Sequence, residues 1–326
     1  MSEENDFDLK NIVLQLEDFG TAENFQQNMK IFLLRVTKAK TDIYKQEADA
    51  ETKKILLETI LKNAHENSFE NREIIGYDSV NSKKNTHELV KVSSYQNISD
   101  MLAKFNDENQ QFTSTSGMNE SKFHSWLVSV NFNGHSYKVI GNYLNTLELE
   151  KKFLFGNFTD TKIDFSKSSS VFGFGKKIDL LIVDDEYVLI NQAETKFENI
   201  FKMNKLFSEE ATKILLNNEQ IGNIFSKETR EKLIEKVKNG KRMATRLISI
   251  VSDADTFRKT VEHISKITEI TDDATHKFYE QVKDVKYENG QLSVEDGLEI
   301  QLINAISDAF VKAFISETER VDKTRL

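Results

Sequence analysis

The alternation of apolar and polar positions predicts a hairpin followed by a helix in the middle of the chain. Two apolar runs rich in β-branched residues, residues 178–183 and 187–190, flank an acidic turn at residues 184–186. Short runs of this kind, separated by turn formers, are typical of hairpin strands with at least one buried face. From Glu194 the apolar residues recur at helical spacing instead, so the chain changes there from strand to helix.

The first hundred residues predict a small α/β region. Residues 29–36 form a continuous apolar run, which suits a central strand covered on both faces. Residues 7–19 predict a strand or a short helix, and residues 98–105 predict a helix that Asn97 or Ser99 would cap. Residues 48–64 predict a longer helix, whose buried stripe would consist of Ile55, Leu56, Ile60 and Leu61.

A polar segment and then an antiparallel region follow. Residues 106–121 contain almost no apolar side chains and predict a linker or a mobile loop. Residues 126–132 and 136–143 predict a hairpin closed by Asn133-Gly134, which is a strong signal for a two-residue turn. Together with the later hairpin, these strands predict an antiparallel sheet in the middle of the chain.

From Glu194 onward the pattern is mostly helical. Asn289-Gly290 predicts one small hairpin, and Asp296 with Glu299 is spaced to cap a last helix. That helix is apolar over so much of its circumference that we expect residues 298–314 to lie in the core or in the interface of a homo-oligomer. Its apolar face consists of Leu302, Ile303, Ile306, Phe310 and Phe314.

These patterns predict an α+β protein with an N-terminal α/β part, a central antiparallel sheet and a mostly helical C-terminal part. The expected regions are residues 1–110, 122–192 and 193–326. The last two could form one continuous domain.

The composition excludes several classes of site. The chain of 326 residues has no cysteine, so it holds no disulfide, thiolate nucleophile or cysteine-ligated metal. No apolar run reaches the roughly 18 residues that a membrane helix needs, and the N-terminus is acidic, unlike a secretory signal. We therefore expect a cytoplasmic protein, and any association with the inner face of the membrane would come through a partner.

One basic cluster stands out against the net charge of −9. Residues 227–246 carry eight cations against three glutamates, and two apolar stripes on either side of Asn239-Gly240 predict a pair of helices. Cations near such a turn can contact phosphates, whereas ion pairs such as Glu228 with Lys232 would make the same surface an ordinary solvated face. The predicted DNA-binding residues are Lys227, Arg230, Lys232, Lys236, Lys238, Lys241, Arg242 and Arg246.

Asp179 and the sequence Glu194-Thr195-Lys196 permit a second hypothesis. Many metal-dependent nucleases place an Asp on one strand and Glu-x-Lys on the next, so that two carboxylates hold Mg²⁺ and the lysine positions a water molecule. Glu194 would serve equally well as an acid in the first turn of a helix. The sequence therefore favours a protein that is not an enzyme and needs no cofactor or metal, with Asp179, Glu194 and Lys196 as the alternative catalytic set.

Two further patterns are weaker indications of a binding site. Residues 172–177, Phe-Gly-Phe-Gly-Lys-Lys, share features with the aromatic strand on which RNA-recognition domains stack bases, but the rest of that motif is absent. Six histidines show no metal-binding spacing along the chain, although His124 and His135 could meet across the predicted hairpin.

The middle of the chain also carries a family resemblance. Its elements are Lys176-Lys177-Ile178-Asp179, the strand at residues 187–190 and the segment 196–201, together with the apolar run 29–36 and the tail 302–326. In these features the chain resembles the KwaB family of the bacterial Kiwa anti-phage defence system. The resemblance implies a DNA-binding effector that blocks phage DNA replication, forms an oligomer and assembles with a KwaA-like membrane protein. A non-enzymatic protein-interaction scaffold is the remaining alternative.

Overall fold

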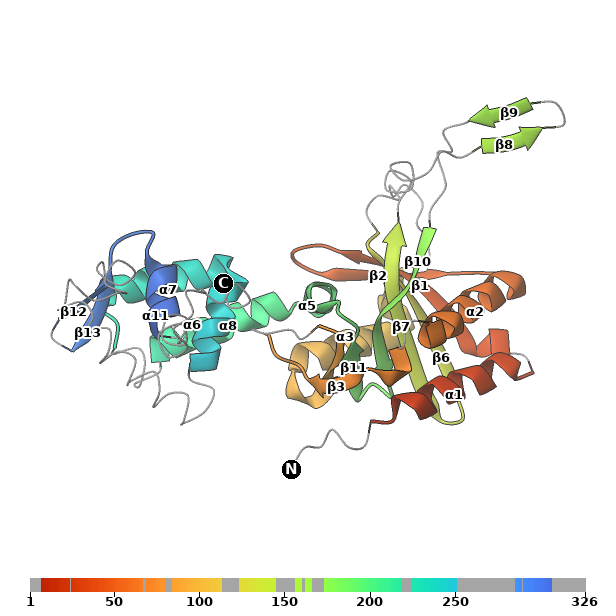
Figure 1. The fold of residues 1–326 in the computed structure, drawn as a ribbon, viewed down its shortest axis with the longest axis horizontal. Helices are drawn as coiled ribbons and strands as arrows, with labels where there is room; N and C mark the ends of the chain where they lie inside the picture. Colours follow the sequence, from red (N-terminus) through yellow and green to blue (C-terminus); the bar gives the residue numbers. More distant parts are fainter. Residues whose placement is uncertain are drawn as a thin grey trace. The chain divides into compact units, whose positions relative to one another are not determined.

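The computed structural model shows an α+β chain that divides into two compact units (Figure 1). Unit 1 consists of Met1–Tyr77 and Ser82–Lys202, and unit 2 consists of Asp78–Asn81 and Met203–Leu326. The structure describes residues 7–23, 25–66, 69–79, 84–112, 123–144, 156–159, 162–165, 173–217, 224–250, 285–288 and 290–306.

Unit 1 is built on a mixed sheet of nine described strands in the order β3-β4-β11-β10-β7-β6-β1-β2-β5. The pairs β3–β4 and β2–β5 are parallel, and the other neighbours in this sheet are antiparallel. The strands are β1 (Met29–Val36), β2 (Thr41–Gln46), β3 (Glu73–Gly76), β4 (Thr86–Lys91), β5 (Gln111–Phe112), β6 (Ser125–Phe132), β7 (His135–Leu144), β10 (Gly173–Val183) and β11 (Tyr187–Ile190). A separate two-stranded ribbon pairs β8 (Gly156–Thr159) with β9 (Lys162–Phe165).

Two tight turns fix the register of the central strands. Asn133 and Gly134, with φ angles of 50° and 82°, join β6 to β7, and Asp184 and Asp185, with φ angles of 53° and 55°, join β10 to β11. Positive φ at both central residues gives a turn whose twist matches that of the strands it joins. Both predicted hairpins are therefore confirmed, and so is the strand at 29–36, which lies between β6 and β2.

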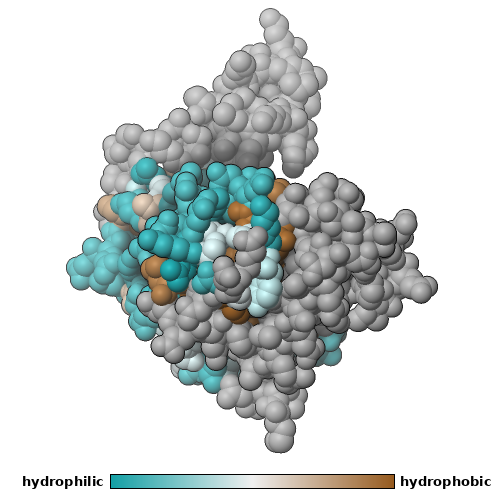
Figure 2. Space-filling view, turned by 90° about the vertical axis from the view of Figure 1, so that its left-hand side faces the viewer, coloured by the Kyte–Doolittle hydropathy of each residue, from teal (hydrophilic) through white to brown (hydrophobic). Residues whose placement is uncertain are grey.

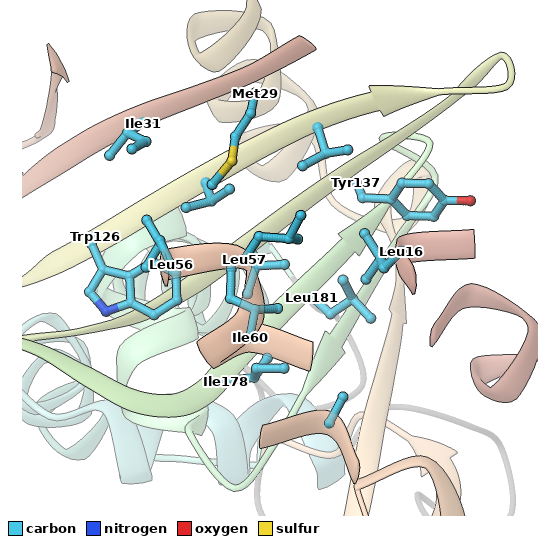
Figure 3. Packing of buried hydrophobic residues seen from close by; sticks show 14 of the residues in the cluster. Leu16, Met29, Ile31, Leu56, Leu57, Ile60, Trp126, Tyr137, Ile178 and Leu181 are labelled. Carbon is cyan, nitrogen blue, oxygen red and sulfur yellow. The ribbon is translucent and has the colours of Figure 1, made fainter. Parts of the chain in front are cut away.

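Helices cover both faces of this sheet (Figure 1). On one face, α1 (Leu9–Thr21) and α2 (Ala50–Glu66) bury apolar stripes against the strands. Leu16 of α1 and Leu57 and Ile60 of α2 pack in the same cluster as Trp126 and Leu181 of the sheet (Figure 3). Burial of such side chains removes apolar surface from water, which is the main force that holds the helices on the sheet.

The opposite face is covered by α3 (Gln96–Asn106) and α5 (Glu194–Phe201), which pack against each other. Polar contacts tie the C-terminal end of α5 to its surroundings. Thr41 donates to the carbonyl of Ile200 at 3.0 Å, and Asn97 donates to the carbonyl of Phe201 at 2.6 Å. These side chains satisfy carbonyl groups that a helix end leaves without intrahelical partners.

Three predictions for unit 1 need correction. In α2 the Ile55 side chain points to solvent, and Leu57 takes its place in the buried stripe. Neither Asn97 nor Ser99 caps α3, because that helix begins one residue before Asn97, after Tyr95. Part of the polar segment 106–121 is not a linker, since Gln111–Phe112 pairs with β2; its residues 113–121 lie outside the described ranges.

The boundaries of the units also differ from the predicted regions. Strands from residues 1–110 and from residues 122–192 alternate within one sheet, so these two regions are not separate units. The break between units falls after Lys202 rather than at residue 193, because α5 belongs to unit 1, where Thr41 of β2 and Asp179 of β10 form hydrogen bonds with it. Lys202 itself has a positive φ of 60° and ends α5 in the left-handed conformation.

The described part of unit 2 consists of helices and one hairpin. Helix α6 (Met203–Asn217) packs on α7 (Lys227–Asn239) and on α8 (Lys241–Ile250), and α11 (Glu299–Ile306) also packs on α7 and α8. The predicted hairpin is present as β12 (Val285–Glu288) and β13 (Gln291–Val294). A backbone bond from Ser226 to Leu292, at 2.9 Å, joins the start of α7 to β13.

The last described helix bears out part of its prediction. Leu302, Ile303 and Ile306 are buried, while Phe310 and Phe314 lie outside the described ranges. The predicted cap is wrong: α11 begins at Glu299, and the amide of Leu302 bonds the carbonyl of Leu298, so Asp296 precedes the first turn and does not cap it. The Asp296 carboxylate instead contacts Lys232 of α7.

Candidate functional site

The basic segment forms two consecutive helices, as its sequence predicts. Ser226 caps α7 by accepting a hydrogen bond from the amide of Thr229, and Leu233 and Val237 form its buried stripe. The chain leaves the helical conformation at Gly240, whose carbonyl accepts the amide of Ala244 and so starts α8. The cations are thereby carried on two short helices joined by a single extended residue.

The eight cations differ greatly in exposure. Lys227, Lys236 and Lys238 are exposed, whereas Arg230, Lys232 and Lys241 are partly buried. Arg246 is only 7% exposed, since it shares the buried face of α8 with Met243, Leu247 and Ile250. Arg246, one of the predicted DNA-binding residues, is therefore a buried residue of α8 and not part of an exposed surface. The side chain of Arg242 lies outside the described part of the chain.

Two of the cations are held by carboxylates. The Lys232 ammonium lies 2.8 Å from Glu228 and 2.9 Å from Asp296, and hydrogen bonds to these two carboxylates raise the pKa of Lys232 above its usual value. The Lys236 ammonium lies 3.7 Å from the carboxylate of Glu299, which is buried. The alternative interpretation, in which Lys232 forms an i to i+4 ion pair with Glu228, is thus confirmed.

Lys227 and Lys238 form no ion pair with any described residue. They are eleven residues apart on α7, which corresponds to about three turns, so they lie on nearly the same side of the helix and about 16 Å apart. Figure 2 shows that the described part of the side facing the viewer is largely hydrophilic. These two lysines are the cations best placed to meet an anion in solution.

The alternative catalytic residues lie in unit 1, near the sheet. Asp179 sits at an irregularity of β10: Ile178 pairs with Gly141 and Leu180 with Ile140, so Asp179 is an extra residue in its strand. Such a bulge redirects side chains locally. The Asp179 carboxylate is almost fully buried, and it accepts a hydrogen bond from the Lys196 ammonium of α5.

Further polar groups surround this pair. The Lys177 ammonium lies 4.0 Å from the second oxygen of Asp179, and Lys196 also donates to the side-chain oxygen of Asn142 at 3.3 Å. Asp179 therefore has two cations within 4.0 Å. A carboxylate that is already neutralised in this way is poorly suited to a divalent cation, which needs several free oxygen ligands.

Glu194 does not complete the predicted metal site. It lies in the first turn of α5 and forms no hydrogen bond or ion pair with the described residues. Within those residues, no group of three or more His, Asp and Glu side chains is arranged to hold a metal ion. The structure thus brings Asp179 and Lys196 together, as the nuclease spacing requires, but in an arrangement that fixes α5 to the sheet.

Sequence patterns give no sign of several other polar contacts in unit 1. Asn191 donates to the carbonyl of Ile178 at 2.6 Å and accepts from Arg72 at 2.7 Å. His87 is fully buried, and its Nε2 lies 2.7 Å from the carbonyl oxygen of Phe69; burial lowers the pKa of His87 to about 4. These partners are distant in sequence, so no local motif could have indicated them.

Neither of the weaker patterns forms a binding site. Phe174 is partly buried and packs against the core residues Trp126 and Tyr143, with ring centroids 5.8 Å and 6.4 Å apart, so packing accounts for this ring. Phe172 lies outside the described ranges. His124 and His135 do not meet, because they lie at opposite ends of the β6–β7 hairpin. His135 lies 2.8 Å from Asp184, and His124 accepts a hydrogen bond from the amide of Val36 at 3.3 Å.

Comparisons with known proteins give no indication of function, so a functional proposal depends on the sites described above. No family model, no curated protein and no solved structure matches the chain. In the described ranges no helix combines the length and the apolar character that crossing a bilayer demands.

Proposed function

We propose that this chain is a DNA-binding effector of bacterial anti-phage defence, and that it binds DNA through phosphate contacts made by Lys227 and Lys238 of α7. The observation that supports the proposal is the exposure of these two lysines on one side of a helix, without ion-pair partners among the described residues. The resemblance to the KwaB family supports the same function. It also suggests a homo-oligomer that works with a KwaA-like membrane protein to block phage DNA replication.

Contacts of this kind determine the character of the binding. Phosphate contacts position a protein on DNA but carry no sequence information, so little base preference is expected. Each neutralised phosphate releases counterions, and affinity therefore falls steeply as salt rises. In a chain with a net charge of −9, such contacts have to be concentrated where cations are exposed.

The test is fluorescence anisotropy with a labelled duplex at several salt concentrations, with and without Mg²⁺. In Lys227→Glu/Lys238→Glu, the affinity should fall at least about fiftyfold near 0.1 M salt, and the salt dependence should become weaker by about two counterions. Both side chains are exposed, so circular dichroism should remain unchanged.

A matched control is available in unit 1. Lys10→Glu/Lys38→Glu makes the same change of charge at two exposed lysines that have no ion-pair partner in the described residues. This control should bind DNA like the wild type. An equal loss in both double variants would mean that overall charge, and not α7, controls binding; an unchanged affinity in the α7 variant would place the DNA site elsewhere. Mg²⁺-dependent cutting that disappears in Asp179→Asn would favour the nuclease alternative.

A further inference from the structure

The segment just before α11 places negative charge against the proposed DNA-binding helix. Asp296 lies 2.9 Å from the ammonium of Lys232, and Glu299 lies 3.7 Å from that of Lys236. Both carboxylates come from the chain that follows β13, and both meet α7 on cations that the sequence assigned to DNA. Asp296, before α11, and Glu299, its first residue, thus each place a carboxylate beside an ammonium group of α7.

The two carboxylates are held differently. Glu299 is buried, and its Oε1 accepts a hydrogen bond from the amide of Gly297 at 3.2 Å, so its contact with Lys236 is part of the packing of α11. Asp296 is 86% exposed and does not cap the helix. Its contact with Lys232 is therefore not enforced by burial, and a phosphate can compete for the same ammonium.

Asp296 is not the only carboxylate that contacts the Lys232 ammonium. Glu228, one turn earlier on α7, already lies 2.8 Å from the same ammonium. A second carboxylate at 2.9 Å surrounds one cation with two anions and leaves a local excess of negative charge. Such an excess repels an approaching DNA backbone, so Asp296 opposes binding at this position.

We propose that Asp296 is an autoinhibitory residue that masks Lys232 from DNA, and that displacement of the segment before α11 makes this lysine available for a phosphate contact on the flank of α7, about 140° around the helix from Lys227. The inference rests on the proposed function. The masking group acts as an internal substitute for a phosphate: it offers the same ammonium an anionic oxygen, and the exposed pair is weak enough to exchange.

The experiment compares DNA affinity in Asp296→Asn and in the wild type by anisotropy. Removal of the Asp296 charge leaves Lys232 with Glu228 alone, an exposed pair that a phosphate can displace, so binding should tighten by up to about eightfold near 0.1 M salt and the salt dependence should steepen by up to about one counterion. Glu295→Gln is the matched control, because it removes the same charge at the neighbouring exposed position, where no ion pair with a described residue is lost. It should change the affinity far less.

A second background tests whether the effect passes through Lys232. In Lys232→Gln, the additional change Asp296→Asn should have no more effect than Glu295→Gln. Equal tightening by Asp296→Asn with and without Lys232, or by Glu295→Gln, would overturn the masking contact and leave only general electrostatics.

The same measurements separate failure of the two proposals. If the wild type binds DNA and Lys227→Glu/Lys238→Glu weakens it, but Asp296→Asn changes nothing, only the masking proposal fails. If neither the wild type nor Asp296→Asn binds, the DNA function fails and the masking proposal fails with it. If Asp296→Asn binds and the wild type does not, masking is supported in its strongest form.

Discussion

Two regions carry charged residues to which the sequence assigns a function: the hairpin and helix β10–β11–α5, and the helix pair α7–α8. The two regions differ in whether these charges are buried or exposed. In the first region Asp179 is buried and is joined across elements to Lys196. In the second region Lys227 and Lys238 are exposed, and Lys232 is held by carboxylates at the surface. One region uses charge to hold the fold, and the other leaves charge available to a partner.

Spacing along the sequence therefore does not tell whether a charge is available to a ligand. The nuclease-like spacing does bring Asp179 to Lys196, yet the lysine neutralises the carboxylate that a metal would need. The basic segment does form two helices, yet Arg246 is buried in their packing. In both regions the availability of a charge depends on which partner the fold supplies.

The largest expected effect comes from breaking the buried pair. Asp179→Ala leaves Lys196, only 20% exposed, without its carboxylate, and should lower the free energy of unfolding by about 3 kcal/mol. The chain has one tryptophan, Trp126, which lies in the sheet of unit 1, so its fluorescence during urea unfolding reports on that unit. The double variant Asp179→Leu/Lys196→Met should recover most of the loss. A loss below about 0.5 kcal/mol in Asp179→Ala, typical of an exposed pair, would show that the comparison is mistaken.

The next effect concerns the buried histidine of unit 1. The pKa of His87 is about 4 in the folded chain, because burial disfavours the charged ring, whereas an unfolded histidine titrates near 6.5. Between these values the unfolded chain binds a proton that the folded chain does not. The contribution of His87 is therefore fully present above about pH 6.5 and is lost as the pH falls towards 4, by up to about 3 kcal/mol.

Urea unfolding of the wild type and of His87→Gln, followed by Trp126 fluorescence at pH 7 and pH 5, measures this dependence. Glutamine keeps an N–H donor for the carbonyl of Phe69 but does not titrate. The wild type should lose clearly more stability than the variant between the two pH values. Identical pH dependence in both proteins would mean that His87 can be protonated without unfolding.

The smallest effect is expected on the exposed side of α7. Lys227→Ala and Lys238→Ala should each change the free energy of unfolding of unit 2 by no more than about 0.5 kcal/mol, because both side chains are exposed and neither pairs with a described residue. Loss of helical circular dichroism during urea unfolding measures the change. A destabilisation as large as that of Asp179→Ala would give these lysines a structural role and would weaken their assignment to DNA.

The local elements of this protein can be predicted from its amino-acid pattern. The hairpins at Asn133-Gly134 and at Asp184–Glu186, the strand Met29–Val36 and the two helices around Gly240 all follow from periodicity and turn chemistry. These signals depend on a few neighbouring residues, so they do not change with the arrangement of the rest of the chain. The α+β class follows from them as well.

How these elements combine, and which charges remain available, depends on tertiary packing. The merging of two predicted regions into one sheet depends on strand pairing between distant segments. Arg72 meets Asn191, 119 residues away, and Lys196 meets Asp179, 17 residues away. Asp296 meets Lys232 instead of capping α11. Local spacing does not encode such contacts, because they form only when packing of the core brings distant side chains to the same place.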